Sequence, residues 1–159
     1  MKKKAAAESW CELPAQQETT RKERASRGCA FYKHQTGFRW KGIRDEAYKP
    51  EGSDWSHIIR RVLVGGHGET ARFHVRYFEI SSGGNSSLEK HRHEHVVICI
   101  RGQGVVLAGK KKRTMEYLDT LYISPDTPHQ LMNPFREPFG FLCIVNARRD
   151  RPKLLAKAK

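Results

Sequence analysis

The sequence predicts an all-β protein, a small barrel or sandwich with an N-terminal arm. Short runs rich in β-branched and aromatic residues follow one another, with Gly, Asn, Asp and Pro between them. No segment between these runs has the apolar spacing of a long amphipathic helix. The length of 159 residues suits one domain with short appendages. Many short strands at close spacing favour a sandwich or barrel over alternating α/β units.

The N-terminal segment, residues 1–39, is polar and basic, with only scattered aromatic side chains. It lacks a continuous apolar face, so we expect it to be partly disordered or to form an arm that orders against the body of the protein. The aromatic residues that follow Cys29 favour an arm for the later part.

The expected domain, residues 40–147, contains the strand-like runs, and residues 148–159 form a basic tail in which residues 151–157 are one helical turn or a frayed end. The runs predicted as strands are Ile58–Val64, Arg72–Ile80, Ser86–Glu89, His95–Ile100, Gly104–Ala108, Arg113–Met115, Thr120–Ile123, His129–Met132 and Phe139–Val145.

The formal net charge of +13 raises the question of a nucleic-acid partner. Residues 1–49 hold twelve basic and six acidic side chains and residues 136–159 hold seven and two, whereas residues 50–135 hold eleven and nine. The excess therefore lies at the two ends, and no helix-turn-helix, zinc-finger or RNP-type pattern accompanies it. We expect no nucleic-acid partner, and we interpret the run Lys110–Arg113 as a solvated hairpin tip.

No membrane partner is expected, because no apolar stretch reaches the roughly 18 residues that span a bilayer. The N-terminal lysines are followed too soon by an acidic residue for a signal peptide. We therefore expect a cytoplasmic protein. Its cysteines show no CxxC spacing and are expected to be free thiols: Cys11, Cys29, Cys99 and Cys143.

Histidines cluster at His91, His93 and His95, and His129 follows at a distance. Residues two apart on a strand share a face, so Glu89, His91 and His93 are expected to point the same way. Carboxylate and imidazole donors without a thiolate suit Mn(II), Fe(II), Ni(II), Co(II) or Zn(II). The cluster therefore predicts a site for a divalent metal ion.

The stretch from Gly83 to Gly102 resembles the first signature motif of the cupin superfamily. A gapless match puts Glu89 and His91 at the two His positions of the motif and His95 at its Glu position. Further along, His129 and Asn133 match the His and Asn of the second cupin motif, although its glycine and proline positions are not matched. Together the two motifs make the resemblance cover about residues 58–146.

The resemblance implies a double-stranded β-helix, the jelly-roll or cupin barrel, with the metal bound by Glu89, His91, His95 and His129. Two other ligand sets remain open: His93 in place of Glu89, or all three clustered histidines. The weaker candidates for catalysis are Cys143, Cys99 and Tyr122, of which Cys99 lies four residues after His95 and so on the same strand face.

One subgroup of cupins is more similar still, the bacterial methylthioxylulose-phosphate methylsulfurylase type. The similar segments are Arg76–Glu79, Gly83–Gly84, Leu88–His95, Gly102–Gly104 and Gly140–Asn146. This similarity implies a metal that polarises the oxygens of a phosphorylated ketose while a thiol takes up the methylthio group. Two alternatives are an Fe(II) dioxygenase and a non-catalytic cupin that binds a small molecule. Small cupin barrels often pair through edge strands, so we expect a homodimer.

Overall fold

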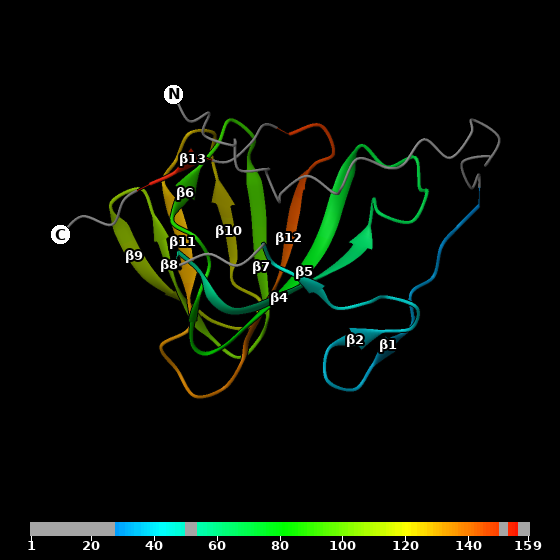
Figure 1. The fold of residues 1–159 in the computed structure, drawn as a ribbon, viewed down its shortest axis with the longest axis horizontal. Helices are drawn as coiled ribbons and strands as arrows, with labels where there is room; N and C mark the ends of the chain where they lie inside the picture. The colour runs from blue at the N-terminus through cyan, green and yellow to red at the C-terminus, as the bar shows by residue number, and fades with distance from the viewer. Residues whose placement is uncertain (1–27, 50–53, 150–152, 156–159) are drawn as a thin grey trace, which may run out of the picture.

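The computed structural model describes residues 28–49, 54–149 and 153–155. Eleven strands in this part of the chain join one antiparallel sheet that curls into a nearly closed barrel, and a two-stranded hairpin lies beside it (Figure 1). The described residues include no helix, and therefore none that could cross a membrane. The all-β prediction is confirmed. Residues 1–27 of the expected N-terminal arm lie outside the described residues.

The strands of the hairpin are β1 (His34–Gln35) and β2 (Arg39–Trp40). The strands of the large sheet are β3 (Glu46–Ala47), β4 (Ser56–Val64), β5 (Phe73–Asn85), β6 (Glu89–Lys90), β7 (His95–Arg101), β8 (Gly104–Ala108), β9 (Lys111–Met115), β10 (Thr120–Ile123), β11 (His129–Met132), β12 (Phe139–Asn146) and β13 (Lys153–Leu154).

Two sequence predictions were wrong around β6. The run Ser86–Glu89 is not one strand, because β5 continues to Asn85 and the next strand begins only at Glu89. The C-terminal segment is not helical where it is described, because β13 pairs with β6 and Leu155 N–H donates to Leu88 O at 2.9 Å. An exposed strand edge has unpaired backbone groups, and β13 provides partners for those of β6.

β12 lies in the middle of the sheet, where it pairs with β5 on one side and with β7 on the other. Side chains alternate between the two faces of each strand, so β7 buries His95, Val97 and Cys99 on its inner face. The inner faces together form one apolar core, built around fully buried residues such as Ile80, Val97 and Phe139. The same inner face that builds the core also carries His95.

The hairpin of β1 and β2 packs on the outer face of β5. Its turn contains Gly37 and Phe38, both with positive φ angles (74° and 54°). The Phe38 ring stacks on Tyr77 with centroids 6.0 Å apart, and Trp40 contacts the same ring at 5.2 Å. Tyr77 is fully buried as a result.

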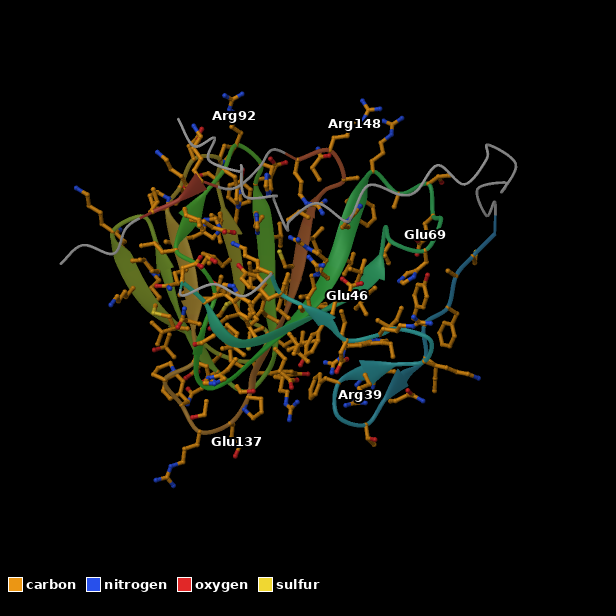
Figure 2. The ribbon with its side chains drawn as sticks, in the orientation of Figure 1. Arg39, Glu46, Glu69, Arg92, Glu137 and Arg148 are labelled. Atoms are coloured by element: carbon orange, nitrogen blue, oxygen red, sulfur yellow. The ribbon has the colours of Figure 1, made fainter. Side chains whose placement is uncertain are left out.

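Charged side chains cover the outside of the barrel, and Arg92, Glu137 and Arg148 point outward from it (Figure 2). The basic run Lys110–Arg113 is exposed on the hairpin that joins β8 and β9. The prediction of a solvated hairpin tip is confirmed.

Candidate metal centre

Three of the predicted ligands meet inside the barrel. His91 follows β6, His95 begins β7 and His129 begins β11, and the side chains are 3%, 7% and 3% exposed. One ligand atom from each ring lies within 4.8 Å of the others. The structure thus brings together residues that are up to 38 positions apart in the sequence.

Backbone carbonyls orient two of these rings. His91 Nδ1 hydrogen-bonds to His93 O at 2.8 Å, and His129 Nδ1 hydrogen-bonds to Thr127 O at 2.9 Å. A carbonyl oxygen only accepts, so each Nδ1 carries the proton and the neutral ring has its lone pair on Nε2. A metal ligand needs this tautomer, and a hydrogen bond from the other ring nitrogen is the usual way to select it.

The third ring, His95, is oriented by a thiol. Its Nδ1 lies 3.3 Å from Cys143 Sγ, and its buried Nε2 has no hydrogen-bond partner among the described residues. Burial, and then the nearby charge of Arg76, holds the pKa of His95 well below its ordinary value. The ring is therefore neutral at physiological pH, and its orphaned Nε2 is an observation that a metal ion would explain.

The donor set fits a divalent transition-metal ion. Two nitrogens bound to one ion at about 2.1 Å lie no more than about 4.2 Å apart. The histidine ligand atoms lie within 4.8 Å of one another, so the rings need to close only slightly around an ion. Imidazole nitrogens suit Mn, Fe, Ni, Co and Zn, the metals expected from the sequence.

Glu89, the fourth predicted ligand, lies outside this three-histidine group. It faces His129 across the ladder between β6 and β11, but its carboxylate accepts a hydrogen bond from Lys49 Nζ at 2.5 Å. His93, the alternative ligand, stacks on His91 with ring centroids 3.6 Å apart. Glu89, His91 and His93 are all buried while Lys90 is half-buried and Arg92 is exposed, as the expected alternation requires, although the strand itself ends at Lys90. A ligand role for Glu89 or for His93 stays a prediction.

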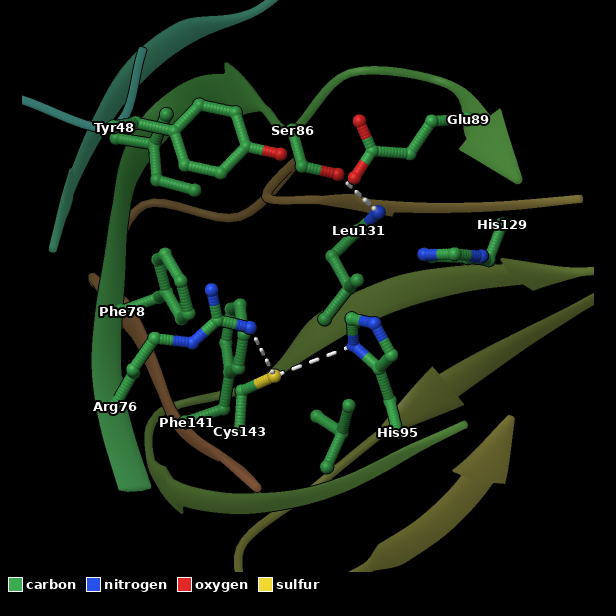
Figure 3. A pocket seen from close by; sticks show the side chains of 12 residues that line it. Tyr48, Arg76, Phe78, Ser86, Glu89, His95, His129, Leu131, Phe141 and Cys143 are labelled. Carbon is green, nitrogen blue, oxygen red and sulfur yellow. Dashed lines mark hydrogen bonds between the residues drawn. The ribbon is translucent and has the colours of Figure 1, made fainter. Parts of the chain in front are cut away.

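A cavity opens beside the histidines (Figure 3). Its volume is about 40 Å³. It has apolar walls and a few polar groups, and it is lined by Tyr48, Ile58, Arg76, Phe78, Ser86, Glu89, His95, Val97, His129, Leu131, Phe141 and Cys143. The lining, mostly apolar with a few converging polar groups, has the character of a small-molecule site.

Strand register places a thiol between an arginine and a histidine in this cavity. Cys143 on β12 lies directly opposite Arg76 on β5 and opposite Val97 on β7. Arg76 Nη2 donates to Cys143 Sγ at 3.4 Å, and the same sulfur is 3.3 Å from His95. If His95 binds a metal through Nε2, its Nδ1 keeps the proton and donates to the sulfur as well.

The other two catalytic candidates lie elsewhere. Cys99 is buried on the same face as His95, but its thiol donates to the carbonyls of Arg101 and Gly102 and does not line the cavity. Tyr122 is 61% exposed, because Ile123 beside it takes the inward position on β10. The structure therefore places Tyr122 on the outer face, away from the cavity lining, and a catalytic role for it stays a prediction.

Sequence reasoning missed Arg76 and Lys49. Arg76 had a signal, since it alternates with the buried His74 and Phe78 on β5 and therefore belongs to the inner face. Lys49 had none, because its pairing with Glu89 joins segments 40 residues apart.

Comparisons with known proteins agree on one family. The family described as "Cupin domain" matches residues 76–145. A curated protein of Rhodospirillum rubrum, 1-methylthio-D-xylulose 5-phosphate methylsulfurylase, is 40% identical over 129 residues, which cover 80% of this chain and 81% of that protein. A crystal structure of a cupin 2 conserved barrel domain protein from Rhodopseudomonas palustris superposes with a TM-score of 0.74 at 34% identity, over 80% of this chain and 87% of that one. A cupin-2 domain from Rhodospirillum rubrum gives a TM-score of 0.70 at 37% identity, over 80% and 84%.

Proposed function

The chain belongs to the cupin family, and on this premise we propose that it is a metal-dependent enzyme acting on a small, phosphorylated sugar-like metabolite inside the barrel. The observation that carries the proposal is the group of three buried histidines, whose ligand atoms lie within 4.8 Å of one another at the wall of a cavity. A divalent ion held there would supply Lewis-acid polarisation of a carbonyl or hydroxyl oxygen.

The chain's own residues provide the remaining functions. The apolar side chains of Phe78, Val97 and Phe141 exclude water from much of the cavity wall. His91 and His129 keep their ligand tautomer through hydrogen bonds to backbone carbonyls. Cys143 places a nucleophilic sulfur in the cavity, 3.3 Å from His95.

The substrate class is inferred from the relative of known function. The name of the Rhodospirillum rubrum protein specifies a phosphorylated ketose that carries a methylthio group, and the alignment spans most of both chains. We propose a substrate of this class for the present chain, and 1-methylthio-D-xylulose 5-phosphate is the first compound to test.

Elemental analysis of protein purified without a histidine tag tests the metal centre. We expect close to one divalent ion per chain in the wild type and large losses in His91→Ala and His129→Ala. His34→Ala is the matched control, because His34 is exposed on β1 and lies outside the cavity. Unchanged metal content in both site variants would refute the proposed metal centre.

Turnover separates the enzyme from the alternatives. Metal-loaded protein is incubated with 1-methylthio-D-xylulose 5-phosphate and a small thiol, and consumption of the sugar phosphate is followed by mass spectrometry. We expect consumption that disappears in His91→Ala. Oxygen uptake that requires Fe(II) would instead identify a dioxygenase, and binding without turnover under every metal would identify a non-catalytic binding protein.

We also propose that two copies pair through strand edges. Within the described residues β9 pairs only with β8, and β10 pairs only with β7, so each has an open edge. Open edges favour pairing with another chain. Light scattering at high protein concentration should give the mass of a dimer, and a monomer mass there would contradict the pairing.

A further inference from the structure

A buried arginine forms part of the cavity wall. Arg76 is 2% exposed and alternates on β5 with the inward-facing His74, Phe78 and Ile80. Its guanidinium carbon lies 5.2 Å from the centroid of the Phe78 ring, and Figure 3 shows the guanidinium directed into the cavity beside Cys143. A permanent positive charge therefore faces the space that a ligand would occupy.

The charge balance around the cavity favours an anion. The carboxylate among the lining residues, Glu89, forms an ion pair with Lys49. With Arg76 the three side chains carry two positive charges and one negative charge, before any metal ion is counted. A ligand with a negative group thus gains attraction from the wall, and a neutral ligand does not.

Cys143 connects Arg76 to the three-histidine group, because its sulfur contacts both Arg76 and His95. His95 contacts Cys143 Sγ through Nδ1, and the same sulfur accepts from Arg76 Nη2 at 3.4 Å. The other nitrogen of the ring, Nε2, is buried, has no hydrogen-bond partner among the described residues and is free to bind a metal ion. The guanidinium and the His95 ring thus flank the same sulfur, so a ligand bound beside Cys143 would meet both the arginine and the histidine group.

We infer that Arg76 binds the phosphate group of the substrate and so sets the preference of this site for a phosphate monoester. The guanidinium presents two parallel N–H donors, a geometry that matches two phosphate oxygens. This inference rests on the proposed function, because it assigns a specificity-determining residue to the same cavity. The exposed basic run Lys110–Arg113 is another candidate for a phosphate contact, and the test below distinguishes it from Arg76.

The test compares two ligands that differ only in the phosphate, D-xylulose 5-phosphate and D-xylulose, by calorimetry on metal-loaded protein. We expect the wild type to bind the phosphate ester about tenfold or more tightly. In Arg76→Met the affinity for the phosphate ester should exceed that for D-xylulose by about threefold or less, while elemental analysis shows an unchanged metal content. Arg61→Met is the matched control, because Arg61 is equally buried at 2% but pairs with Asp45 outside the cavity.

The outcomes separate this inference from the proposed function. The role of Arg76 would be overturned if Arg76→Met kept the wild-type ratio between the affinities for D-xylulose 5-phosphate and D-xylulose. It would also be overturned if the double variant Lys111→Met/Lys112→Met lost that preference instead, even if metal and turnover remain. Should Arg76→Met fail to fold, Arg76→Lys keeps the buried charge but lacks the two parallel N–H donors of the guanidinium. The preference of this variant for the phosphate ester over D-xylulose should fall at least about threefold. His91→Ala should lose metal and turnover yet still bind inorganic phosphate, a result that a purely structural Arg76 would not give.

Discussion

Cys143 Sγ lies 3.3 Å from His95 Nδ1, and the other nitrogen of that ring, Nε2, is buried without a hydrogen-bond partner among the described residues. The contact follows from register, because Cys143 pairs with Val97 and the residue two positions before Val97 on the same face is His95. The thiol of Cys143 thus lines the cavity and also contacts the imidazole of His95. Its replacement can therefore affect the reaction without removing a predicted metal ligand.

Replacing Cys143 by serine should lower turnover of 1-methylthio-D-xylulose 5-phosphate by about 100-fold or more, because a hydroxyl is a far weaker nucleophile. Metal content should not change. Cys99→Ser is the control, since Cys99 is equally a buried thiol but lies outside the cavity lining. Equal activity in the two variants would exclude Cys143 from the reaction.

Glu89→Gln should weaken metal binding more than His93→Gln. Glu89 lines the cavity and faces His129 across the ladder, whereas His93 does not line it and stacks on His91. We expect a loss in affinity of about tenfold or more for Glu89→Gln, the range seen when a ligand or its supporting group is removed. Competition with a chromogenic chelator measures both constants, and a larger loss in His93→Gln would reverse the assignment.

Lys49→Met should destabilise the fold by roughly 1–3 kcal/mol, because it leaves the carboxylate of Glu89, which is 4% exposed, without its ion-pair partner. The double variant Lys49→Met/Glu89→Gln removes both charges and should recover part of the loss. Urea denaturation of the two single variants and the double variant gives the coupling. Strictly additive effects would mean that the ion pair contributes nothing.

Stability should fall as the pH is lowered from about 6.5 to 4. Burial, followed by the charges of Arg149 and Arg76, lowers the pKa of His74 to about 4. Between these two pH values the unfolded chain binds a proton at this residue that the folded chain does not, so the free energy of unfolding decreases by up to roughly 3 kcal/mol. Denaturant titrations at several pH values in this range should show that the free energy of unfolding falls more steeply with decreasing pH in the wild type than in His74→Gln. The same pH dependence in both proteins would show that His74 does not contribute to the loss of stability.

Gly104→Ala should cost roughly 2–3 kcal/mol of stability. A Cβ at this position would lie 2.2 Å from Cδ1 of Phe139, a fully buried core residue that cannot easily move aside. Gly109→Asn is the control, because nothing lies within 4 Å of a Cβ there and asparagine tolerates its φ of +63°. Thermal melts should show a clear loss only for Gly104→Ala.

Much of the fold could be predicted because its signals are local. The alternation in His95–Arg101 and Phe139–Asn146 is visible in the chain itself, and both segments are strands in the structure. The local sequence pattern did not predict a strand where pairing with another strand determines the conformation. Lys153–Leu154 has no strand pattern of its own, and it is extended because β6 offers an edge.

The candidate site divides in the same way. The spacing of the histidines and the two motifs were sufficient to select His91, His95 and His129, which the structure brings together. They could not show that Tyr122 lies on the outer face, because the pairing of the whole sheet decides which face of a short strand points inward.

The sequence by itself determined the all-β class, most of the strand segments and the three histidines that meet inside the barrel. The tertiary structure alone decided that Lys49 pairs with Glu89 and that Cys143 lies between Arg76 and His95. The physical reason is that periodicity specifies which face a residue occupies within its own strand. The register between strands far apart in the chain is instead set by the packing of the complete barrel.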